Sequence, residues 1–389
     1  MIYYALAETY VARAERSIRV QDMLTRLFAL PSLQLVSNRF GFPMTLKELA
    51  HILGLSPTTV SRALNGYPEV SESTRRRVAE AATRHNYHPN VQAKRLATGR
   101  AMAIGHVIPI STQHEIVNPV FADFIAGAGE VYARAGYDMI ISIVADDDEE
   151  QAYRTLRSKG NVDGVIVHGP KRGDPRPALL DELGLPYVVH GRVSDYAAPY
   201  AWVDVNNTRA FERGTAFLSD LGHRRIALVN GLESMDFAAR RREGYEAALA
   251  ARGLARDPAL MTTGEMTEAQ GYDAACAMLS LPDPATAFLT SSLLSAMGVR
   301  RAIEERGLAL GRDVSVLTHD DELSYMKNGT ELPIFTATRS SVREAGRICA
   351  QMLLDRIAAG PEAPIATRLL EAVLVVGQST APARHLIAS

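Results

Sequence analysis

The spacing of apolar and polar residues follows two different patterns along the chain, and the pattern changes near Met102. After this residue, apolar runs of strand length alternate with segments that carry an apolar residue every three or four positions, as amphipathic helices do. Strands are predicted over 103–108, 138–144, 162–167, 187–190, 226–230, 287–290 and 314–317. Helices are predicted over 121–135, 151–158, 179–183, 207–221, 240–251, 271–279, 296–306 and 342–358.

This alternation of strand and helix predicts parallel sheets that are covered by helices on both faces. The segment contains about 290 residues, which is too many for one such sheet of ordinary size. We therefore expect two similar lobes with a cleft between them. Ligand-binding residues are expected at the carboxyl ends of the strands.

Residues 44–88 instead carry the pattern of three short helices. Thr45 and Glu48 have the spacing of a capping box, in which each residue caps the backbone of the other. Ser56 and Ser71 are placed to cap the second and third helices. Two helices joined by a tight, glycine-containing turn predict a helix-turn-helix motif.

The second helix of this motif exposes short, hydrogen-bonding side chains, as a reader of the DNA major groove requires. Arg62 can bind a guanine edge with two nitrogens, and Thr58 or Thr59 can meet a thymine methyl group or a base acceptor. The remaining polar side chains suit phosphates: Ser56, Ser61 and Asn65. Helical hairpins that bind no DNA are also common, so the motif alone leaves both interpretations open.

A short basic segment follows at 89–101. Asn90 can cap a helix of about seven residues, which is too short to be stable alone in water. This helix could fold on DNA and insert Leu96 into the minor groove as a wedge. The alternative is a plain linker with Leu96 packed against the rest of the protein.

The net charge of −2 is distributed unevenly. Residues 44–100 hold nine Lys and Arg against four Asp and Glu, and residues 1–43 hold five Arg against three acids. The remaining 289 residues therefore carry a net charge of −9. A basic module on an acidic body indicates that the module binds a polyanion. The alternative is that these charges form a solvated helix face.

Residues 1–43 precede both patterns. An amphipathic helix is predicted over 3–30, and it ends at Pro31. This segment is interpreted either as the product of an upstream start codon or as a genuine extra arm.

The composition is that of an ordinary soluble globular protein, with 47% hydrophobic and 22% charged residues. The two cysteines lie 73 positions apart and fit neither a disulfide framework nor a metal knuckle. No apolar run approaches the roughly 18 residues that span a bilayer, and the start lacks the pattern of a signal peptide. We therefore expect a cytoplasmic protein.

Sequence motifs of common enzymes are missing. The chain has no phosphate-binding loop, no G-x-S-x-G elbow and no H-E-x-x-H motif. The acids at 146–150 suit a helix start better than a metal ion. We expect no enzyme, no cofactor and no metal. A sugar kinase fused to a DNA-binding module would need the phosphate loop, and a purely architectural DNA-binding protein would not explain the acidic body.

Several segments resemble the LacI/GalR-type bacterial transcription repressors. They are 45–65, 70–75 and 86–96, with matching spacing, together with 222–227 and 241–245 in the regulatory domain. The resemblance covers about residues 44–380. It implies a homodimer whose paired recognition helices bind two half-sites of a pseudo-palindromic operator. It also implies a set of DNA-contacting residues: Leu46, Ser56, Pro57, Thr58, Thr59, Ser61, Arg62, Asn65, Ser71, Thr74, Tyr87, Asn90, Ala93 and Leu96.

The resemblance further implies that the two lobes are similar to periplasmic sugar-binding proteins and that they hold a small effector, a sugar. Three residues match effector-contacting positions: Phe121, Arg241 and Met266. Relatives place an Asp where this chain has Leu293, and three residues are candidates to replace it: Ser291, Ser292 and Asp320. A different ligand class, or a structural role for each residue, stays open. Residues 318–321 resemble a subgroup linked to α-glucoside use. No leucine-heptad tail follows Gly377, which favours a dimer over a tetramer.

Together these observations predict an N-terminal all-α helix-turn-helix domain over 44–88, a hinge helix or linker over 89–101, and a two-lobed, periplasmic-binding-protein-like α/β domain over 102–389. The predicted function is a sequence-specific transcription repressor whose affinity for operator DNA is changed by a small ligand. Whether the ligand is an inducer or a corepressor stays open at this point.

Overall fold

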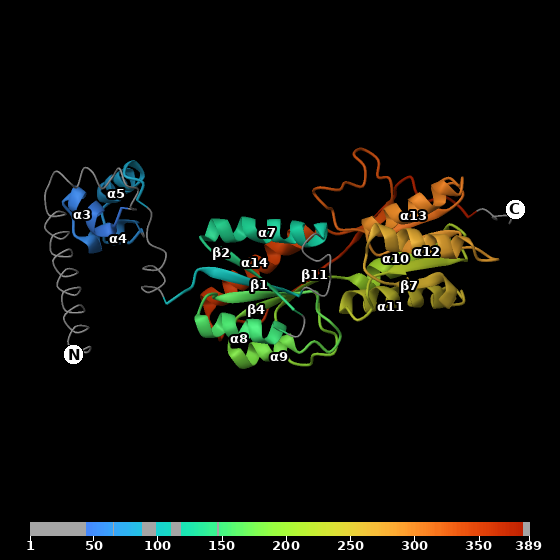
Figure 1. Ribbon diagram of the computed structural model, residues 1–389, viewed down its shortest axis with the longest axis horizontal. Helices are drawn as coiled ribbons and strands as arrows, with labels where there is room; N and C mark the ends of the chain where they lie inside the picture. The colour runs from blue at the N-terminus through green and yellow to red at the C-terminus, as the bar shows by residue number, and fades with distance from the viewer. Residues whose placement is uncertain (1–43, 65, 88–98, 110–117, 146–147, 384–389) are drawn as a thin grey trace, which may run out of the picture. The chain divides into compact units, whose positions relative to one another are not determined.

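The computed structural model describes residues 44–64, 66–87, 99–109, 118–145 and 148–383, and the chain forms two compact units, 1–99 and 100–389 (Figure 1). The helix predicted over 3–30 and most of the predicted hinge segment lie outside the described residues. Within the described ranges, no helix is both long enough and apolar enough to cross a membrane.

In the described part of the first unit, three helices surround a small core of their own. They are α3 (Leu46–Leu53), α4 (Pro57–Leu64) and α5 (Glu72–Arg84). The predicted capping box is confirmed, because the Glu48 backbone N–H donates to Thr45 Oγ1 at 3.3 Å and the Thr45 backbone N–H donates to Glu48 Oε2 at 2.7 Å. The core residues come from all three helices and from the segments that join them: Leu49, Ala50, Val60, Ala63, Val70, Val78, Ala81, Ala82 and Tyr87.

The second unit contains two six-stranded sheets, and each sheet is the centre of one lobe. In the first lobe the strand order is β11-β5-β4-β3-β1-β2, and all neighbouring strands are parallel. These strands are β1 (Ala103–Pro109), β2 (Asp138–Val144), β3 (Gly164–His168), β4 (Tyr187–His190), β5 (Trp202–Val205) and β11 (Thr367–Leu370). The helices of this lobe are α7 (Pro119–Ala135), α8 (Glu149–Lys159), α9 (Arg176–Leu183) and α14 (Val342–Ala359).

In the second lobe the strand order is β12-β10-β9-β8-β6-β7, and only β12 runs antiparallel to its neighbour. These strands are β6 (Ile226–Asn230), β7 (Met261–Thr263), β8 (Ala287–Thr290), β9 (Ser315–Asp320), β10 (Thr336–Arg339) and β12 (Val373–Val375). The helices are α10 (Asn207–Asp220), α11 (Asp236–Ala251), α12 (Glu268–Leu279) and α13 (Leu293–Glu305), with a short 3₁₀ turn, η2 (Pro258–Leu260).

Successive residues of the central strands face opposite layers of helices. On β3, Ile166 packs in the cluster with α7 and α14, whereas Val165 and Val167 pack in the cluster with α8 and α9. On β8, Phe288 packs with α12 and α13, whereas Leu289 packs with α10 and α11. Burial on both faces explains why these strands are continuous apolar runs in the sequence. The predicted fold class, a helical domain followed by a two-lobed α/β domain, is confirmed.

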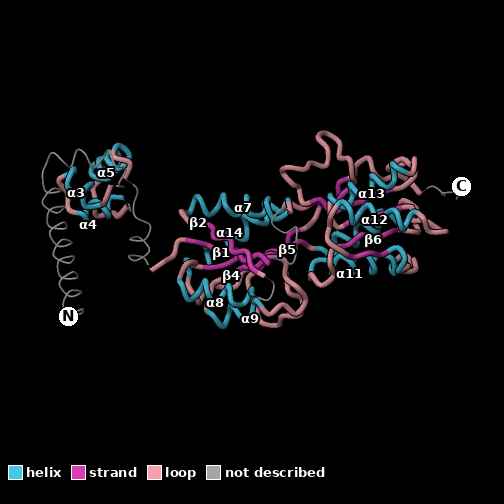
Figure 2. The backbone as a smooth tube through the Cα atoms, viewed as in Figure 1, coloured by secondary structure: helices cyan, strands magenta, loops and turns pink. Residues whose placement is uncertain are grey.

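The chain passes between the two lobes at three described connections, from β5 into α10, from β10 into α14 and from β11 into β12. Each lobe is therefore assembled from separate stretches of sequence. Figure 2 shows strands β1 and β4 of the first lobe between helix α7 on one side and helices α8 and α9 on the other. The carboxyl ends of the parallel strands in the two lobes supply residues to one cavity, described below.

Helices α7 and α14 cross closely at two glycines. A Cβ atom on Gly127 would lie 2.0 Å from the carbonyl oxygen of Arg343, and one on Gly346 would lie 2.3 Å from the carbonyl oxygen of Phe124. Because both neighbours are backbone atoms, neither can move aside as a flexible side chain could. The packing of these two helices therefore requires glycine at both positions.

Candidate functional site

Helix α4 presents the polar face that the sequence predicts. Thr58 and Arg62 are exposed, whereas Val60 and Ala63 on the opposite side are buried in the core of the domain. Pro57 is exposed at the first position of the helix. The side chains of Thr58 and Arg62 are therefore accessible to an outside partner such as a base edge.

Two pairs of hydroxyl groups cap the helices of this domain. Ser56 Oγ accepts a hydrogen bond from the Thr59 backbone N–H at 3.0 Å and lies 2.8 Å from Thr59 Oγ1. Ser71 Oγ accepts from the Thr74 backbone N–H at 3.3 Å and lies 2.9 Å from Thr74 Oγ1. These four side chains thus hold helix N-termini, where backbone N–H groups also favour phosphate oxygens.

The structure places the other predicted DNA-contacting residues differently. Leu46 is half-buried against the helical core, and Tyr87 is 7% exposed within it, so both help to pack the domain. Ser61 is half-buried on α4. Four predicted residues lie outside the described part of the chain: Asn65, Asn90, Ala93 and Leu96.

A cavity of about 580 Å³ lies in the second unit and is lined by residues of both lobes. Phe121, Arg241 and Met266 all line it. The remaining lining side chains include several aromatic, amide, imidazole and carboxylate groups: Asn118, Phe124, His168, His190, Asp204, Asn207, Phe237, His319 and Asp321. Apolar walls with a few placed polar groups are typical of a small-molecule site.

Arg241 is the buried cation of this cavity, with 5% of its surface exposed. Its Nε donates to Asn207 Oδ1 at 2.8 Å and its Nη1 donates to the Ser291 carbonyl oxygen at 2.6 Å. The guanidinium carbon lies 5.1 Å from the centre of the Phe211 ring and 4.9 Å from that of Phe237. Burial lowers the pKa of Arg241 to about 10, so the group stays charged at neutral pH.

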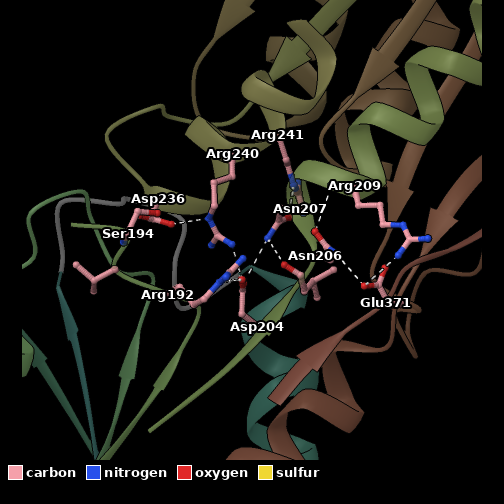
Figure 3. Close-up of polar contacts among 12 residues, drawn as sticks. Arg192, Ser194, Asp204, Asn206, Asn207, Arg209, Asp236, Arg240, Arg241 and Glu371 are labelled. Atoms are coloured by element: carbon pink, nitrogen blue, oxygen red, sulfur yellow. Dashed lines mark hydrogen bonds and ion pairs between the residues drawn. The ribbon is translucent and has the colours of Figure 1, made fainter. Parts of the chain in front are cut away.

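Buried ion pairs connect the two lobes beside the cavity. Arg240 on α11 donates from Nη1 to Asp204 Oδ2 at 2.5 Å, and Asp204 stands on β5 of the other lobe. Arg240 Nε also donates to Asp236 Oδ1 at 2.6 Å, and Asp236 Oδ2 accepts from the Ser194 backbone N–H at 2.8 Å. Figure 3 shows Arg192 facing the same Asp204 carboxylate, at 2.9 Å from Arg192 Nε.

A second polar bridge lies on the other side of Asn207 (Figure 3). Asn206 Nδ2, at the start of α10, donates to Glu371 Oε1 at 2.8 Å, and Arg209 Nη1 lies 3.8 Å from the same oxygen. Glu371 directly follows β11, where the chain leaves the first lobe for the last time. The Arg240–Asp204 pair and the contact of Asp236 with Ser194 therefore link the two lobes, and a change in the angle between the lobes must break or rearrange them. The bridge to Glu371 is exposed, and Arg241 bonds within the second lobe, to Asn207 and Ser291.

Among the residues that the structure describes, three histidines line the cavity, and none of them was among the predicted site residues. His168 and His190 end β3 and β4, and His319 lies at the carboxyl end of β9. Burial lowers the pKa of His190 to about 4 and lowers those of His168 and His319 below their ordinary value. All three imidazoles are therefore neutral near pH 7. Their positions at strand ends were the signal that could have identified them.

Asp321, also absent from the predicted set, is the carboxylate that lines the cavity next to His319. Its Oδ1 lies 3.5 Å from His319 Nε2, and His319 Nδ1 lies 3.2 Å from Thr338 Oγ1. Burial would raise the pKa of Asp321, but His319 and Arg241 outweigh it and hold the pKa below its ordinary value. Asp321 is thus an ionised hydrogen-bond acceptor in the wall of the cavity.

Ser292 and Asp320 were predicted to contact the effector, and the structure places both outside the lining of this cavity. Ser292 Oγ caps α13 by accepting from the Ser295 backbone N–H at 3.1 Å. Asp320 Oδ1 accepts from the Glu322 backbone N–H at 2.9 Å, and its Oδ2 lies 3.4 Å from Arg339 Nε. Leu293 packs in the core of its lobe, whereas the next residue, Leu294, lines the cavity.

Comparison with protein-family models gives two matches. Residues 45–90 match the model of bacterial regulatory proteins of the lacI family. Residues 102–371 match the model of periplasmic binding proteins and the sugar-binding domain of the LacI family. Together the two models cover the helical domain and both lobes.

Curated relatives agree with these matches. The chain is 44% identical over 341 residues to the HTH-type transcriptional regulator AglR of Rhizobium meliloti (strain 1021), an alignment that covers 88% of this chain and 95% of AglR. It is 35% identical over 322 residues to the regulator RafR of Escherichia coli, covering 82% of this chain and 94% of RafR.

Solved structures are similar over nearly the same length. A complex of the regulator CelR with cellobiose matches with a TM-score of 0.64 at 29% identity, covering 86% of this chain and 99% of CelR. A lac repressor dimer bound to operator and the anti-inducer ONPF matches with a TM-score of 0.74 at 26% identity, covering 87% and 100%. The helical domain, the two lobes and these matches show that the chain belongs to the LacI family of bacterial transcriptional regulators.

Proposed function

We propose that this protein is a homodimeric transcription repressor that binds a pseudo-palindromic operator and releases it when a sugar occupies the cavity between the lobes. The observation that carries the proposal is the combination within one chain of an exposed polar face on α4 and a cavity lined by two ion-paired lobes. The function needs no catalysis and no cofactor. It operates in the cytoplasm, where bacterial DNA lies.

In the DNA complex, Arg62 and Thr58 read bases in the major groove, because both side chains are exposed on α4. Pro57, at the first position of the helix, has no side-chain donor, so base preference rests on the other two residues. The hydroxyl pairs at the helix N-termini, Ser56 with Thr59 and Ser71 with Thr74, position the domain on phosphates. Leu96 enters the minor groove, as the resemblance implies.

The ligand of the cavity is a disaccharide with an α-glucosidic linkage. Aromatic walls from Phe121, Phe124 and Phe237 suit the C–H faces of sugar rings, and Arg241 and Asp321 offer a donor and an acceptor for hydroxyl groups. The similar structure of CelR holds cellobiose, a disaccharide. The preference for an α linkage comes from the resemblance at residues 318–321.

Regulation then follows from the buried contacts between the lobes. A ligand that binds one lobe arrangement better than another shifts the equilibrium between them, with a coupling free energy of typically about 1–3 kcal/mol. The sugar favours an arrangement that separates the hinge segments of the dimer. The Leu96 segments then lose their pairing, and affinity for the operator falls.

The test is fluorescence anisotropy of the full chain on DNA from upstream of its own gene, with a salt series. Maltose, sucrose and trehalose are compared with cellobiose and glucose. We expect tight, salt-dependent binding that an α-linked disaccharide weakens. Tight binding that no sugar changes would contradict the proposed ligand class. Binding no tighter than to random DNA, with and without each sugar, would contradict the repressor on this operator.

A further inference from the structure

Three side chains form a continuous hydrogen-bonded chain behind the wall of the cavity. His168 Nε2 lies 2.8 Å from His106 Nδ1, and the other ring nitrogen of His106, Nε2, lies 3.4 Å from the Tyr132 hydroxyl. His168 lines the cavity, whereas His106 and Tyr132 are buried in the first lobe, with 0% and 1% exposure. Only the first member of the chain can therefore meet a ligand.

Aromatic contacts fix the orientation of the His168 ring. Phe121 and Phe124 both meet it edge to face, with ring centres 5.2 Å and 4.9 Å away. The His106 ring is tilted by only 24° from the plane of the His168 ring, with ring centres 5.1 Å apart, as fits two imidazoles joined edge to edge by a hydrogen bond. With Nε2 directed at His106, the second nitrogen, Nδ1, is the one available to the cavity. Nδ1 has no hydrogen-bond partner among the residues that the structure describes.

The pKa values of these three side chains determine how many protons each of them carries. Burial lowers the pKa of His106 to about 3 and that of His168 well below its ordinary value, so each ring carries a single proton at neutral pH. Burial also raises the pKa of Tyr132, so its hydroxyl keeps its proton. The described residues offer that hydroxyl one acceptor, His106 Nε2. A buried hydroxyl that does not donate would be costly.

The order of donors is then determined. Tyr132 donates to His106 Nε2, so the His106 proton is on Nδ1 and is donated to His168 Nε2. His168 must therefore carry its own proton on Nδ1. The N–H group of His168 therefore faces the cavity as a donor, and Tyr132, inside the lobe, determines this tautomer through His106.

We propose that His106 and Tyr132 are positioning residues that fix His168 as a hydrogen-bond donor, and that the cavity therefore selects a ligand with an oxygen acceptor at this place and rejects one with an ammonium group there. The specificity part rests on the proposed function, since it concerns the sugar of the same cavity. A sugar hydroxyl, ring oxygen or glycosidic oxygen satisfies the donor. The ammonium of an amino sugar leaves two donors facing each other.

The tautomer is tested first, on the ligand-free full chain. The protein is labelled with ¹⁵N-histidine, and the His168 signals are assigned by their loss in the variant His168→Gln. We expect Nδ1 to be protonated and Nε2 not to be. The variant Tyr132→Phe, which keeps the size of the ring, should give a mixture of both tautomers. Protonation of His168 at Nε2 in the unsubstituted protein would overturn the proposal.

Ligand affinity is tested next, by titration with maltose. His106→Leu leaves His168 Nε2 unpaired and should weaken binding roughly ten-fold. His106→Gln keeps one donor and one acceptor and should recover most of this loss. Equal losses in His106→Leu and His106→Gln, with the tautomer of His168 unchanged, would overturn the positioning role. Thermal unfolding of each variant shows whether it folds.

The analogue of maltose with an ammonium group in place of one hydroxyl identifies the rejected position. At the hydroxyl that meets His168, replacing the hydroxyl by an ammonium group should weaken binding more in the unsubstituted protein than in Tyr132→Phe, because His168 of that variant can become an acceptor. An equal loss of affinity in both proteins at every position would overturn the proposed selectivity. If the unsubstituted protein binds neither maltose nor the other sugars of the panel, the proposed ligand class fails, and the tautomer measurement still decides the orientation of His168.

Discussion

Arg240 on α11 donates a hydrogen bond to Asp204 on β5, so a buried ion pair joins the two lobes at the edge of the ligand cavity. Both side chains are nine-tenths buried or more. Charges in such a place are stable only as long as each keeps its partner. The relative position of the lobes therefore depends on an ion pair whose carboxylate, that of Asp204, also lines the cavity.

The substitution Asp204→Asn tests whether the ion pair with Arg240 holds the lobes together. It leaves the buried Arg240 with one carboxylate in place of two, so we expect a loss of about 3 kcal/mol in the free energy of unfolding, measured with urea. The control is Asp220→Asn, which removes an exposed ion pair to Arg252 and should cost less than about 1 kcal/mol. Equal effects of the two substitutions would mean that the pair does not hold the lobes.

The substitution Arg62→Ala tests base reading by α4. Loss of a bidentate contact should cost about 1–3 kcal/mol of operator binding and relax the preference at one position of each half-site. Anisotropy with a set of singly substituted operators measures both effects. Arg76→Ala, which removes an exposed arginine from α5, should leave base preference unchanged. A uniform loss on every sequence for Arg62→Ala would contradict base reading.

The substitution Arg241→Ala tests the cavity. We expect operator binding to persist and the response to the sugar to disappear, because Arg241 lines the cavity and is far along the chain from α4. Operator release measured against sugar concentration gives the result. The neighbouring Arg242 is a matched control: it pairs with Glu233 and Glu246 and does not line the cavity, so Arg242→Ala should respond normally. A normal response in Arg241→Ala would remove this residue from the site.

Stability should fall as the pH decreases below about 6.5. Burial holds the pKa of His190 at about 4 and that of His106 at about 3, whereas both would titrate near 6.5 in the unfolded chain. The unfolded state thus binds more protons than the native state. The free energy of unfolding therefore decreases as the pH falls, by up to about 1.4 kcal/mol per pH unit for each such histidine.

Urea unfolding between pH 7.5 and 5 measures this dependence above the range of most carboxylates. His106→Gln removes one of the titrating groups and should reduce the slope by about one proton. An identical slope in this variant would show that His106 takes up its proton at the same pH in the native protein as in the unfolded chain, and would contradict the lowered pKa.

Two glycines of α7 provide a matched pair for packing. Gly127→Ala places a Cβ against the backbone of Arg343 and should cost about 1–3 kcal/mol or more in unfolding free energy. Gly129→Ala lies on the same helix but meets nothing closer than a methionine methyl group at 3.8 Å. Since alanine favours a helix over glycine, Gly129→Ala should be neutral or stabilising by up to about 1 kcal/mol. Equal destabilisation by both would contradict the close crossing of α7 and α14.

The sequence predicts the parts of this fold that local patterns determine. The capping box at Thr45, the buried strand at 103–108 and the helix that ends before Gly136 all carry signals within a few residues. The short strands β5, β7, β10, β11 and β12 were not predicted, because four of them carry polar residues in place of a continuous apolar run and β12 has only three residues. Their strand conformation depends on neighbours that are distant in the sequence, such as β5 for β11.

The candidate site was predicted unevenly for the same reason. Phe121, Arg241 and Met266 were placed by resemblance, and they line the cavity. Asp320 was predicted as a site residue and Asp321 was not. Neighbouring residues of an extended chain point in opposite directions, so a shift of one position decides which of the two lines the cavity, and it is Asp321. The partnership of His168 with His106 and Tyr132 joins three elements, and no local pattern shows it.

The three passages of the chain between the lobes also constrain how the protein is made and altered. The first sheet is completed by β11, which ends at Leu370, so the first lobe cannot finish folding on the ribosome until nearly the whole chain has been synthesised. For the same reason, one lobe cannot be exchanged with that of a relative at a single junction. A chimaera that keeps both sheets intact needs matched junctions at all three passages, and a change of ligand in this family is therefore simpler to reach by substitutions in place.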